Sequence, residues 1–310
     1  HLEKLAEREK DWPTLASVLE RRVSEADDDK KKVKTLQKLG VIYGEHLDEA
    51  IKAASAWKRI LDIQPKNGRA LRTLRETFVQ AQDFEGLEAL YAEQDDWEGL
   101  VDVLGNAAEK AKDDAVKVDL SFRAAAIYEE RLEQPHRAFR SYERVLGVDG
   151  QNERAARALI PIYERDEKHQ RMPALYEVHY GHAESDADRL ELLDTLRRLS
   201  LEHLSDEKGA YGYAARAFEL APTEPEVRDA LLASAESGRM HAALVELLQK
   251  RLTAVEAEEG AEDEQLWLRR RIASVAGEQL GESEQAVEQL EQILAVRPDG
   301  VEEAEILGGL

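Results

Sequence analysis

The stretch from Leu36 to Asn67, LQKLGVIYGEHLDEAIKAASAWKRILDIQPKN, decides how the rest of the sequence is interpreted. Apolar or small residues recur three and four positions apart in two runs, which is the spacing of one face of an α-helix. Residues 46–48 separate the runs, and Pro65 ends the second because proline does not fit a helix interior. The stretch therefore predicts two amphipathic helices joined by a short turn.

The small and aromatic residues of this stretch follow a known pattern, W-x2-L-G-x2-Y…A-x3-F…P. Gly40, Tyr43 and Ala53 match it, while Leu36 stands in the Trp place and Trp57 in the Phe place. In this respect the hairpin resembles a tetratricopeptide (TPR) unit. Its spacing from Tyr43 to Ala53 is one residue longer than a unit of about 34 residues allows.

The same pattern returns further along the chain. Tyr128 and Ala138 repeat the elongated spacing of Tyr43 and Ala53, and in a third copy Ser200 replaces the Tyr. We therefore expect TPR-like hairpins at about 33–65, 118–150, 190–222 and 266–298.

A second series of helix starts alternates with these hairpins, opened by Trp12, Trp97, Met172 and Met240. The long repeat thus contains two hairpins, and the larger step between the first two copies predicts an extra short helix between about 83 and 104. No strand-like alternation is present. The resemblance implies an all-α, right-handed α-α superhelix (TPR-like solenoid) of about 14–16 helices. We expect a single elongated array over 1–310, taken from a longer chain.

Charge excludes several functions. The 43 Lys and Arg residues face 65 Asp and Glu residues, which gives a net charge of −22. Binding nucleic acid or anionic lipid requires positive surface, so we expect neither partner. The absence of cysteine rules out disulfides and thiolate metal sites. No apolar run is long enough for a membrane span.

Location and origin are inferred only from general features of the sequence. We expect a cytoplasmic protein, although the first residue is His1 and a removed N-terminal signal is an alternative. The Ala- and Arg-rich composition without cysteine suggests a bacterial source.

No catalytic signature is present, so we expect neither enzymatic activity nor a cofactor. His179 and His182 are three residues apart and could share one face of a helix toward a metal. No further ligand stands at a convincing spacing, so surface histidines are the simpler interpretation.

The TPR resemblance implies a concave surface lined by the first helix of each hairpin, where such arrays bind peptides or proteins. Glutamate occupies the last groove position of all four copies. The candidate partner-binding residues are Glu45, Phe122, Glu129, Glu130, Asp194, Glu202, Trp267 and Glu278. We expect a non-catalytic interaction scaffold for a basic or amphipathic partner segment. A solvated helix surface is the alternative for the glutamates, and a structural spacer or self-assembling rod is the alternative for the chain.

Overall fold

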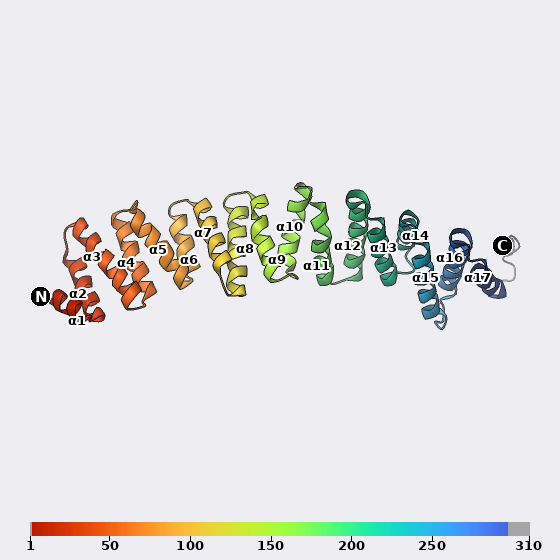
Figure 1. The fold of residues 1–310 in the computed structure, drawn as a ribbon, viewed down its shortest axis with the longest axis horizontal. Coiled ribbons are helices and arrows are strands. Elements are labelled where there is room, and N and C mark those ends of the chain that lie inside the picture. Colours follow the sequence, from red (N-terminus) through yellow and green to blue (C-terminus); the bar gives the residue numbers. More distant parts are fainter. Residues whose placement is uncertain (1, 297–310) are drawn as a thin grey trace. The chain divides into compact units, whose positions relative to one another are not determined.

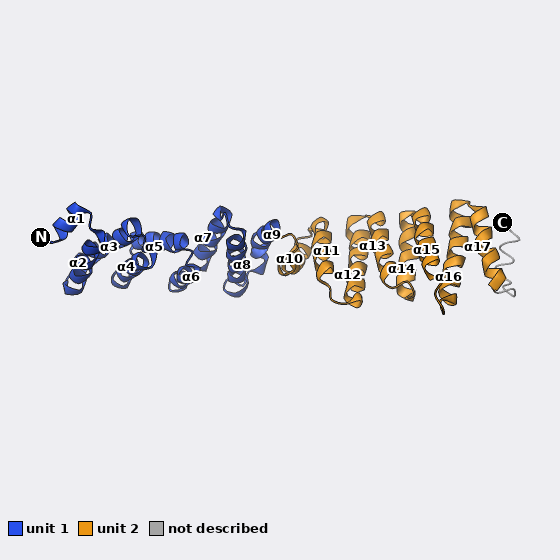
Figure 2. Cartoon of the chain, turned by 90° about the horizontal axis from the view of Figure 1, so that it is seen from below, with its two compact units in different colours: residues 1–148 blue, residues 149–310 orange. Residues whose placement is uncertain are grey.

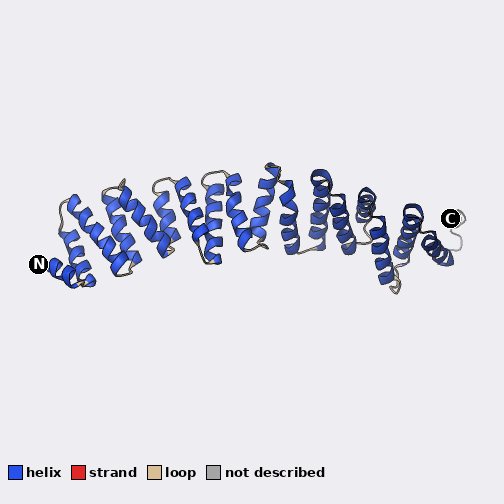
Figure 3. Cartoon of the chain, viewed as in Figure 1, coloured by secondary structure: helices blue, strands red, loops and turns tan. Residues whose placement is uncertain are grey.

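The computed structural model describes residues 2–296, in two compact units, His1–Val148 and Asp149–Leu310 (Figure 2). All regular structure in the described residues is helical, without a strand (Figure 3). The prediction of an all-α fold is confirmed, with 17 α-helices in these residues against the 14–16 expected. The single array expected over 1–310 stays a prediction. Among the described helices, none combines the length and apolar character needed to cross a membrane.

In the first unit, successive helices pack in chain order: α3 on α4, α4 on α5 and α7 on α8 (Figure 1). The nine-residue α6 is the extra short helix that the sequence predicts. The elements are α1 Leu2–Glu9, α2 Trp12–Glu25, α3 Asp29–Val41, η1 Ile42–His46, α4 Ala50–Ile63, α5 Gly68–Ala81, α6 Phe84–Ala92, α7 Trp97–Lys110, α8 Asp114–Glu130, η2 Pro135–Ala138 and α9 Phe139–Val148.

The second unit is built in the same way, with α10 on α11, α12 on α13 and α13 on α14. Its elements are α10 Glu153–Arg165, η3 His169–Arg171, α11 Met172–His182, α12 Asp186–Leu199, η4 Ser200–Leu204, α13 Glu207–Leu220, α14 Pro225–Gly238, α15 His241–Val255, α16 Glu262–Ser274, η5 Val275–Leu280 and α17 Ser283–Val296. The elements η1, η4 and η5 are π-helical turns, whereas η2 and η3 are 3₁₀ turns.

Side-chain caps set where many helices begin. An Asp, Asn or Ser at the N-cap accepts a hydrogen bond from a backbone N–H of the first turn, which would otherwise have no partner in the helix. Among the described helices, nine begin in this way, at Asp11, Asp28, Asn67, Asp83, Asp96, Asp113, Asn152, Ser185 and Asp206.

The core consists of successive apolar clusters that join neighbouring helices. In the first unit, Leu39 of α3 and Trp57 and Ile60 of α4 belong to one buried cluster, and Leu104 of α7 and Leu120 of α8 belong to the next. Full burial of one such aliphatic or aromatic side chain stabilises the fold by about 1.5–3 kcal/mol. Each helix therefore depends mainly on its neighbours in sequence, as in repeat proteins.

Two kinds of turn between the described helices contain a residue with positive φ. In one kind, the residue after the left-handed position donates its N–H to a carbonyl five residues earlier, as Asp11 does to Ala6 and Lys168 does to Tyr163. In the TPR-like hairpins the corresponding bond spans six residues. Its donor–acceptor pairs are Glu49–Tyr43, Gln134–Tyr128, Asp206–Ser200 and Glu282–Ala276.

Three ring contacts connect the two kinds of turn. Trp12 stacks on His46 with ring centroids 3.9 Å apart, and His169 stacks on His203 at 4.0 Å. The guanidinium carbon of Arg131 lies 5.0 Å from the ring centroid of Trp97. In all three pairs, the partners are 34 residues apart in the sequence (12 and 46, 97 and 131, 169 and 203).

These contacts correct one part of the predicted register. Trp12, Trp97 and His169 each stand two residues after a left-handed residue, namely Lys10, Asp95 and Glu167. His169 therefore holds the place of Trp12 in the turn, whereas Met172 begins α11 as the sequence predicts. The 3₁₀ turn η3 begins at His169 and directly precedes α11, so it displaces the apparent match by three residues.

Candidate interaction grooves

The first unit contains a groove of about 410 Å³, which we call the acidic groove. The end of α3, η1, the start of α4 and the face of α5 surround it. Its lining residues are Gly40, Val41, Gly44, Glu45, Asp48, Ala50, Trp57, Thr73, Glu76, Thr77, Gln80 and Ala81. Three carboxylates and no Lys, Arg or His are among them.

The local backbone places two of the carboxylates. Glu45 lies in the π-helical turn η1 and is exposed, and Asp48 occupies the left-handed position that ends this turn. Glu76 reaches the groove from α5 and is exposed as well. No Lys or Arg of the described residues forms an ion pair with any of the three. The groove therefore has negative charge that no Lys or Arg within residues 2–296 compensates by an ion pair.

The floor of the acidic groove depends on one glycine. A Cβ atom on Gly40 would lie 2.5 Å from Nε1 of Trp57, whose side chain is 2% exposed. Gly40 thus lets the indole of α4 pack directly against the backbone of α3. The glycine therefore permits a close approach of α3 and α4 at this point.

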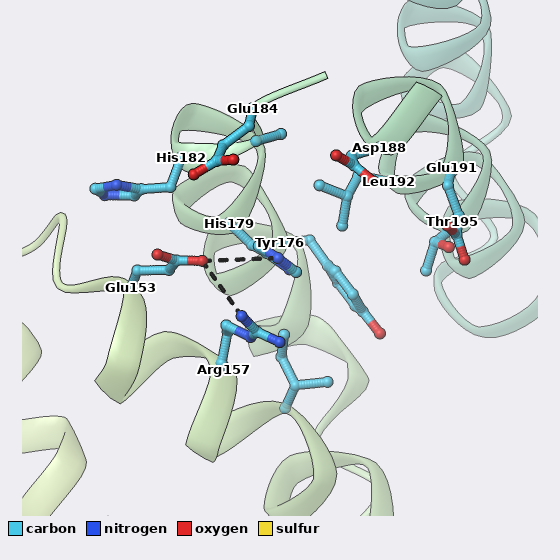
Figure 4. Close-up of a pocket in the computed structure, with 12 residues that line it drawn as sticks. Glu153, Arg157, Tyr176, His179, His182, Glu184, Asp188, Glu191, Leu192 and Thr195 are labelled. Carbon is cyan, nitrogen blue, oxygen red and sulfur yellow. Dashed lines mark ion pairs between the residues drawn. The ribbon is translucent and has the colours of Figure 1, made fainter. Parts of the chain in front are cut away.

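A second groove, about 770 Å³ in volume, lies in the second unit between α10, α11 and α12 (Figure 4). Glu153 of α10 stands between Arg157 and His179, at nitrogen–oxygen distances of 3.6 and 3.8 Å. Asp188 and Glu191 of α12 lie on the opposite side. We call it the α10–α12 groove.

The α10–α12 groove differs in charge from the acidic groove, because it contains the cation Arg157 and two histidines. The Nε2 atom of His182 lies 2.8 Å from the carbonyl oxygen of Gln151. Burial raises the pKa of Tyr176 above its usual value; Glu164 adds to this effect and Arg198 opposes it. The groove therefore combines both signs of charge around a largely neutral phenol.

Metal binding has no support in the described residues, where no three His, Asp or Glu side chains converge as metal ligands. His179 faces Glu153 and His182 faces the backbone of Gln151. The two histidines thus have separate partners.

The predicted partner-binding residues of the first unit have different surroundings. Of these, Glu45 lines the acidic groove. The phenol of Tyr142 donates a hydrogen bond to the Glu129 carboxylate, and the half-buried Phe122 meets the same Tyr142 ring edge-on at 6.2 Å. Glu130 is exposed at the end of α8.

The predicted residues of the second unit are partly engaged within the chain. Asp194 forms ion pairs with Arg197 and Arg198, at nitrogen–oxygen distances of 2.6 and 3.1 Å. Arg228 lies 4.1 Å from the ring centroid of Trp267. Burial lowers the pKa of Arg228 from its usual value, while Glu264 acts in the opposite direction.

Two predicted glutamates of the second unit lie in π-helical turns. Glu202 is exposed in η4, and Glu278 in η5 accepts a hydrogen bond from Ser274 Oγ at 3.3 Å. Together with Glu45 they hold the same place within their hairpins. A common partner-binding role for the four glutamates stays a prediction.

Sequence reasoning missed two acidic-groove residues. Asp48 follows the predicted helix and was assigned only to the break, and Glu76 lies on a helix without the TPR pattern. A signal for Glu76 was available, because α5 directly follows the hairpin and packs on its second helix, α4.

Comparison with solved structures gives weak matches. MamA is 16% identical with a TM-score of 0.25, over 60% of this chain and 98% of its own. The C-terminal part of a TPR repeat-containing protein from Cytophaga hutchinsonii is 13% identical with a TM-score of 0.28, over 74% and 98%. PilF of Pseudomonas aeruginosa is 17% identical with a TM-score of 0.25, over 77% and 99%.

No protein-family model matches the sequence. No curated protein matches it either. At TM-scores this low the structural matches support no conclusion, so the fold assignment rests on the helices, turns and packing of the chain itself.

Proposed function

We propose that this protein is a non-catalytic interaction scaffold that holds a basic segment of a partner protein in the acidic groove. The observation that carries the proposal is the set of three carboxylates, Glu45, Asp48 and Glu76, around one groove without a cation in its lining. A Lys or Arg side chain supplies the missing charge and donates hydrogen bonds to these oxygens.

The neutral part of the groove favours a peptide over a free ion. Val41, Ala50 and Ala81 offer apolar surface for the methylene stem of a Lys or Arg side chain. Thr73 and Gln80 add polar atoms to the lining, which can pair with the donors and acceptors of a peptide backbone. The combination suits a long basic side chain attached to a polypeptide.

The expected affinity from charge alone is modest. An exposed ion pair contributes about 0.2–1 kcal/mol, so three carboxylates give a weak and salt-sensitive contact. Complementary charge contributes more to the association rate and to partner selection than to affinity. A natural partner must therefore gain further energy from neighbouring surface.

The test is binding of a fluorescent Lys-rich peptide to the native chain and to Glu45→Lys. We expect weaker binding to the variant and a loss of binding to the native chain as salt rises. The matched control is Asp62→Lys, because Asp62 is exposed on α4, outside the groove lining, and gives the same change in net charge. If both variants lose binding equally, or if neither loses binding, the proposal is contradicted and the spacer alternative is favoured.

A further inference from the structure

Next to the acidic groove lies a smaller and more apolar cavity of about 270 Å³, which we call the apolar hollow. It is formed by α5 and α7, and its apolar lining consists of Val79, Val103 and Ala107. These three side chains are partly buried, so their outer surfaces remain open to a ligand.

The acidic groove and the apolar hollow have two residues in common. Glu76 and Gln80 of α5 line both cavities. They are four positions apart and lie one above the other on the helix surface. The two cavities are therefore adjoining parts of one surface, divided by a ridge of α5 side chains.

The α7 side of the apolar hollow carries a positive charge. Lys110, in the last turn of α7, is exposed and forms no ion pair with a described residue. Arg75 lines the hollow from α5, where its guanidinium donates a hydrogen bond to the Tyr91 hydroxyl at 3.2 Å. On the α7 side of the hollow, Lys110 is therefore the cation that a ligand carboxylate can reach.

We propose that this surface selects an amphipathic partner segment that presents a Lys or Arg, then an aliphatic side chain, then a carboxylate. The inference rests on the proposed function of the acidic groove and adds the order of the groups. The basic group pairs with Glu45, Asp48 and Glu76, the aliphatic group packs on Val79 and Val103, and the carboxylate pairs with Lys110.

The distance between the cavities sets the spacing in the ligand. Neighbouring helices lie about 8–10 Å apart, so two cavities on either side of α5 are separated by about that distance. In a helical ligand, about seven residues span 10 Å. A carboxylate about four positions further lies on the same face of the ligand helix.

The experiment uses two synthetic helical peptides of equal composition and the full chain. The first presents Lys, Leu about seven positions later and Glu about four positions after Leu, in a background of Ala and Gln. In the second peptide Leu and Glu are exchanged. Fluorescence anisotropy is expected to give about 5-fold weaker binding of the second peptide, because its Leu no longer reaches the apolar hollow.

Two variants of the chain test the individual contacts. Lys110→Glu is expected to weaken binding of the first peptide about 2- to 5-fold. It should restore binding of a third peptide, in which the final Glu is replaced by Lys. Lys112→Glu is the control, since Lys112 is exposed and lies outside the lining. Val103→Thr, which keeps the side-chain size, is expected to weaken binding of the first peptide more than binding of the second.

The outcomes separate this inference from the proposed function. Glu45→Lys could weaken the binding of all peptides while the order of groups and Lys110→Glu leave binding unchanged. In that case the amphipathic order is wrong and the basic-segment proposal stands. If Glu45→Lys has no effect, the proposed function fails and the inference fails with it. Circular dichroism of Lys110→Glu, an exposed substitution, verifies that the helices are intact.

Discussion

The backbone N–H of Glu49 donates a hydrogen bond to the carbonyl oxygen of Tyr43, six residues earlier, at 2.8 Å. The corresponding bond in the alternate turns spans five residues, as from Asp11 to Ala6. The additional residue of the TPR-like hairpins is therefore accommodated at the end of their first helix. It also widens the turn from which Glu45 enters the acidic groove.

Left-handed residues end these turns, and three of the four are not glycine. Ser205 has a φ of 52°, whereas the equivalent Gly281 has a φ of 70°. A side chain at such a position costs about 1–2 kcal/mol, which glycine avoids. Greater freedom of glycine in the unfolded chain offsets part of this gain. We predict that Ser205→Gly raises the free energy of unfolding by about 0.5–1 kcal/mol.

Urea denaturation followed by circular dichroism measures this effect. The control is Ala233→Gly, at an exposed position inside α14, which should lower stability by about 1 kcal/mol. A decrease for both variants would mean that the left-handed backbone at Ser205 carries no strain.

The turn illustrates what sequence could and could not predict. The extra residue was visible, because Tyr43 to Ala53 and Tyr128 to Ala138 have the same elongated spacing. Its structure was not, because the left-handed positions are held by Asp48, Glu133 and Ser205, and only the last copy has the glycine that usually signals such a turn.

The stack of Trp12 on His46 connects α2 to the hairpin that follows it. Their ring planes are 9° from parallel, and an aromatic pair contributes about 0.5–1.5 kcal/mol beyond its buried area. We predict that His46→Ala lowers the thermal midpoint of unfolding. His136→Ala, at an exposed position in the 3₁₀ turn η2, should leave it unchanged. Equal midpoints for both variants would assign the stack no part in stability.

Tryptophan fluorescence provides an independent measurement of the same contact. Since His46 covers the indole of Trp12, its removal should change the emission of that residue. Comparing the spectra of native and His46→Ala chains, with Trp12→Phe as the reference for its contribution, tests whether the stack persists in solution.

Gly40 permits the contact between α3 and Trp57, and this opposes the usual preference of helices for alanine. In an open helix interior, Gly→Ala adds about 1 kcal/mol of stability. Gly40→Ala instead places a methyl group against the buried indole, and such overpacking costs about 1–3 kcal/mol. We predict a net loss of stability, measured by urea denaturation.

Gly105 provides the matched control for Gly40. It lies inside α7, and a Cβ atom there would meet no atom within 4 Å. Gly105→Ala should therefore be neutral or stabilising. A gain of stability for Gly40→Ala would show that the indole moves at little cost.

The candidate site was predictable only where the TPR pattern extends. Glu45 was found because it stands two residues after Tyr43 in a recognisable hairpin. Glu76, Val103 and Lys110 lie on α5 and α7, which lack that pattern, and their proximity to Glu45 depends on how these helices pack. Helical periodicity assigns a residue to a face, but it does not specify which neighbouring face completes a cavity.

Tyr211 makes the free energy of unfolding depend on pH in the alkaline range. Burial in α13 raises its pKa to about 12, with a further contribution from Glu246, whereas an unfolded tyrosine has a pKa of about 10. Between these values the unfolded chain loses the phenol proton and the folded chain keeps it. The contribution to stability is complete below pH 10 and is lost as pH rises toward 12.

Lysines also titrate in this range, so the comparison is with Tyr211→Phe, which should lose less stability between pH 9 and pH 11. Urea denaturation at both pH values measures the difference, and an identical loss in the two proteins would mean that Tyr211 ionises equally in the folded and unfolded chains.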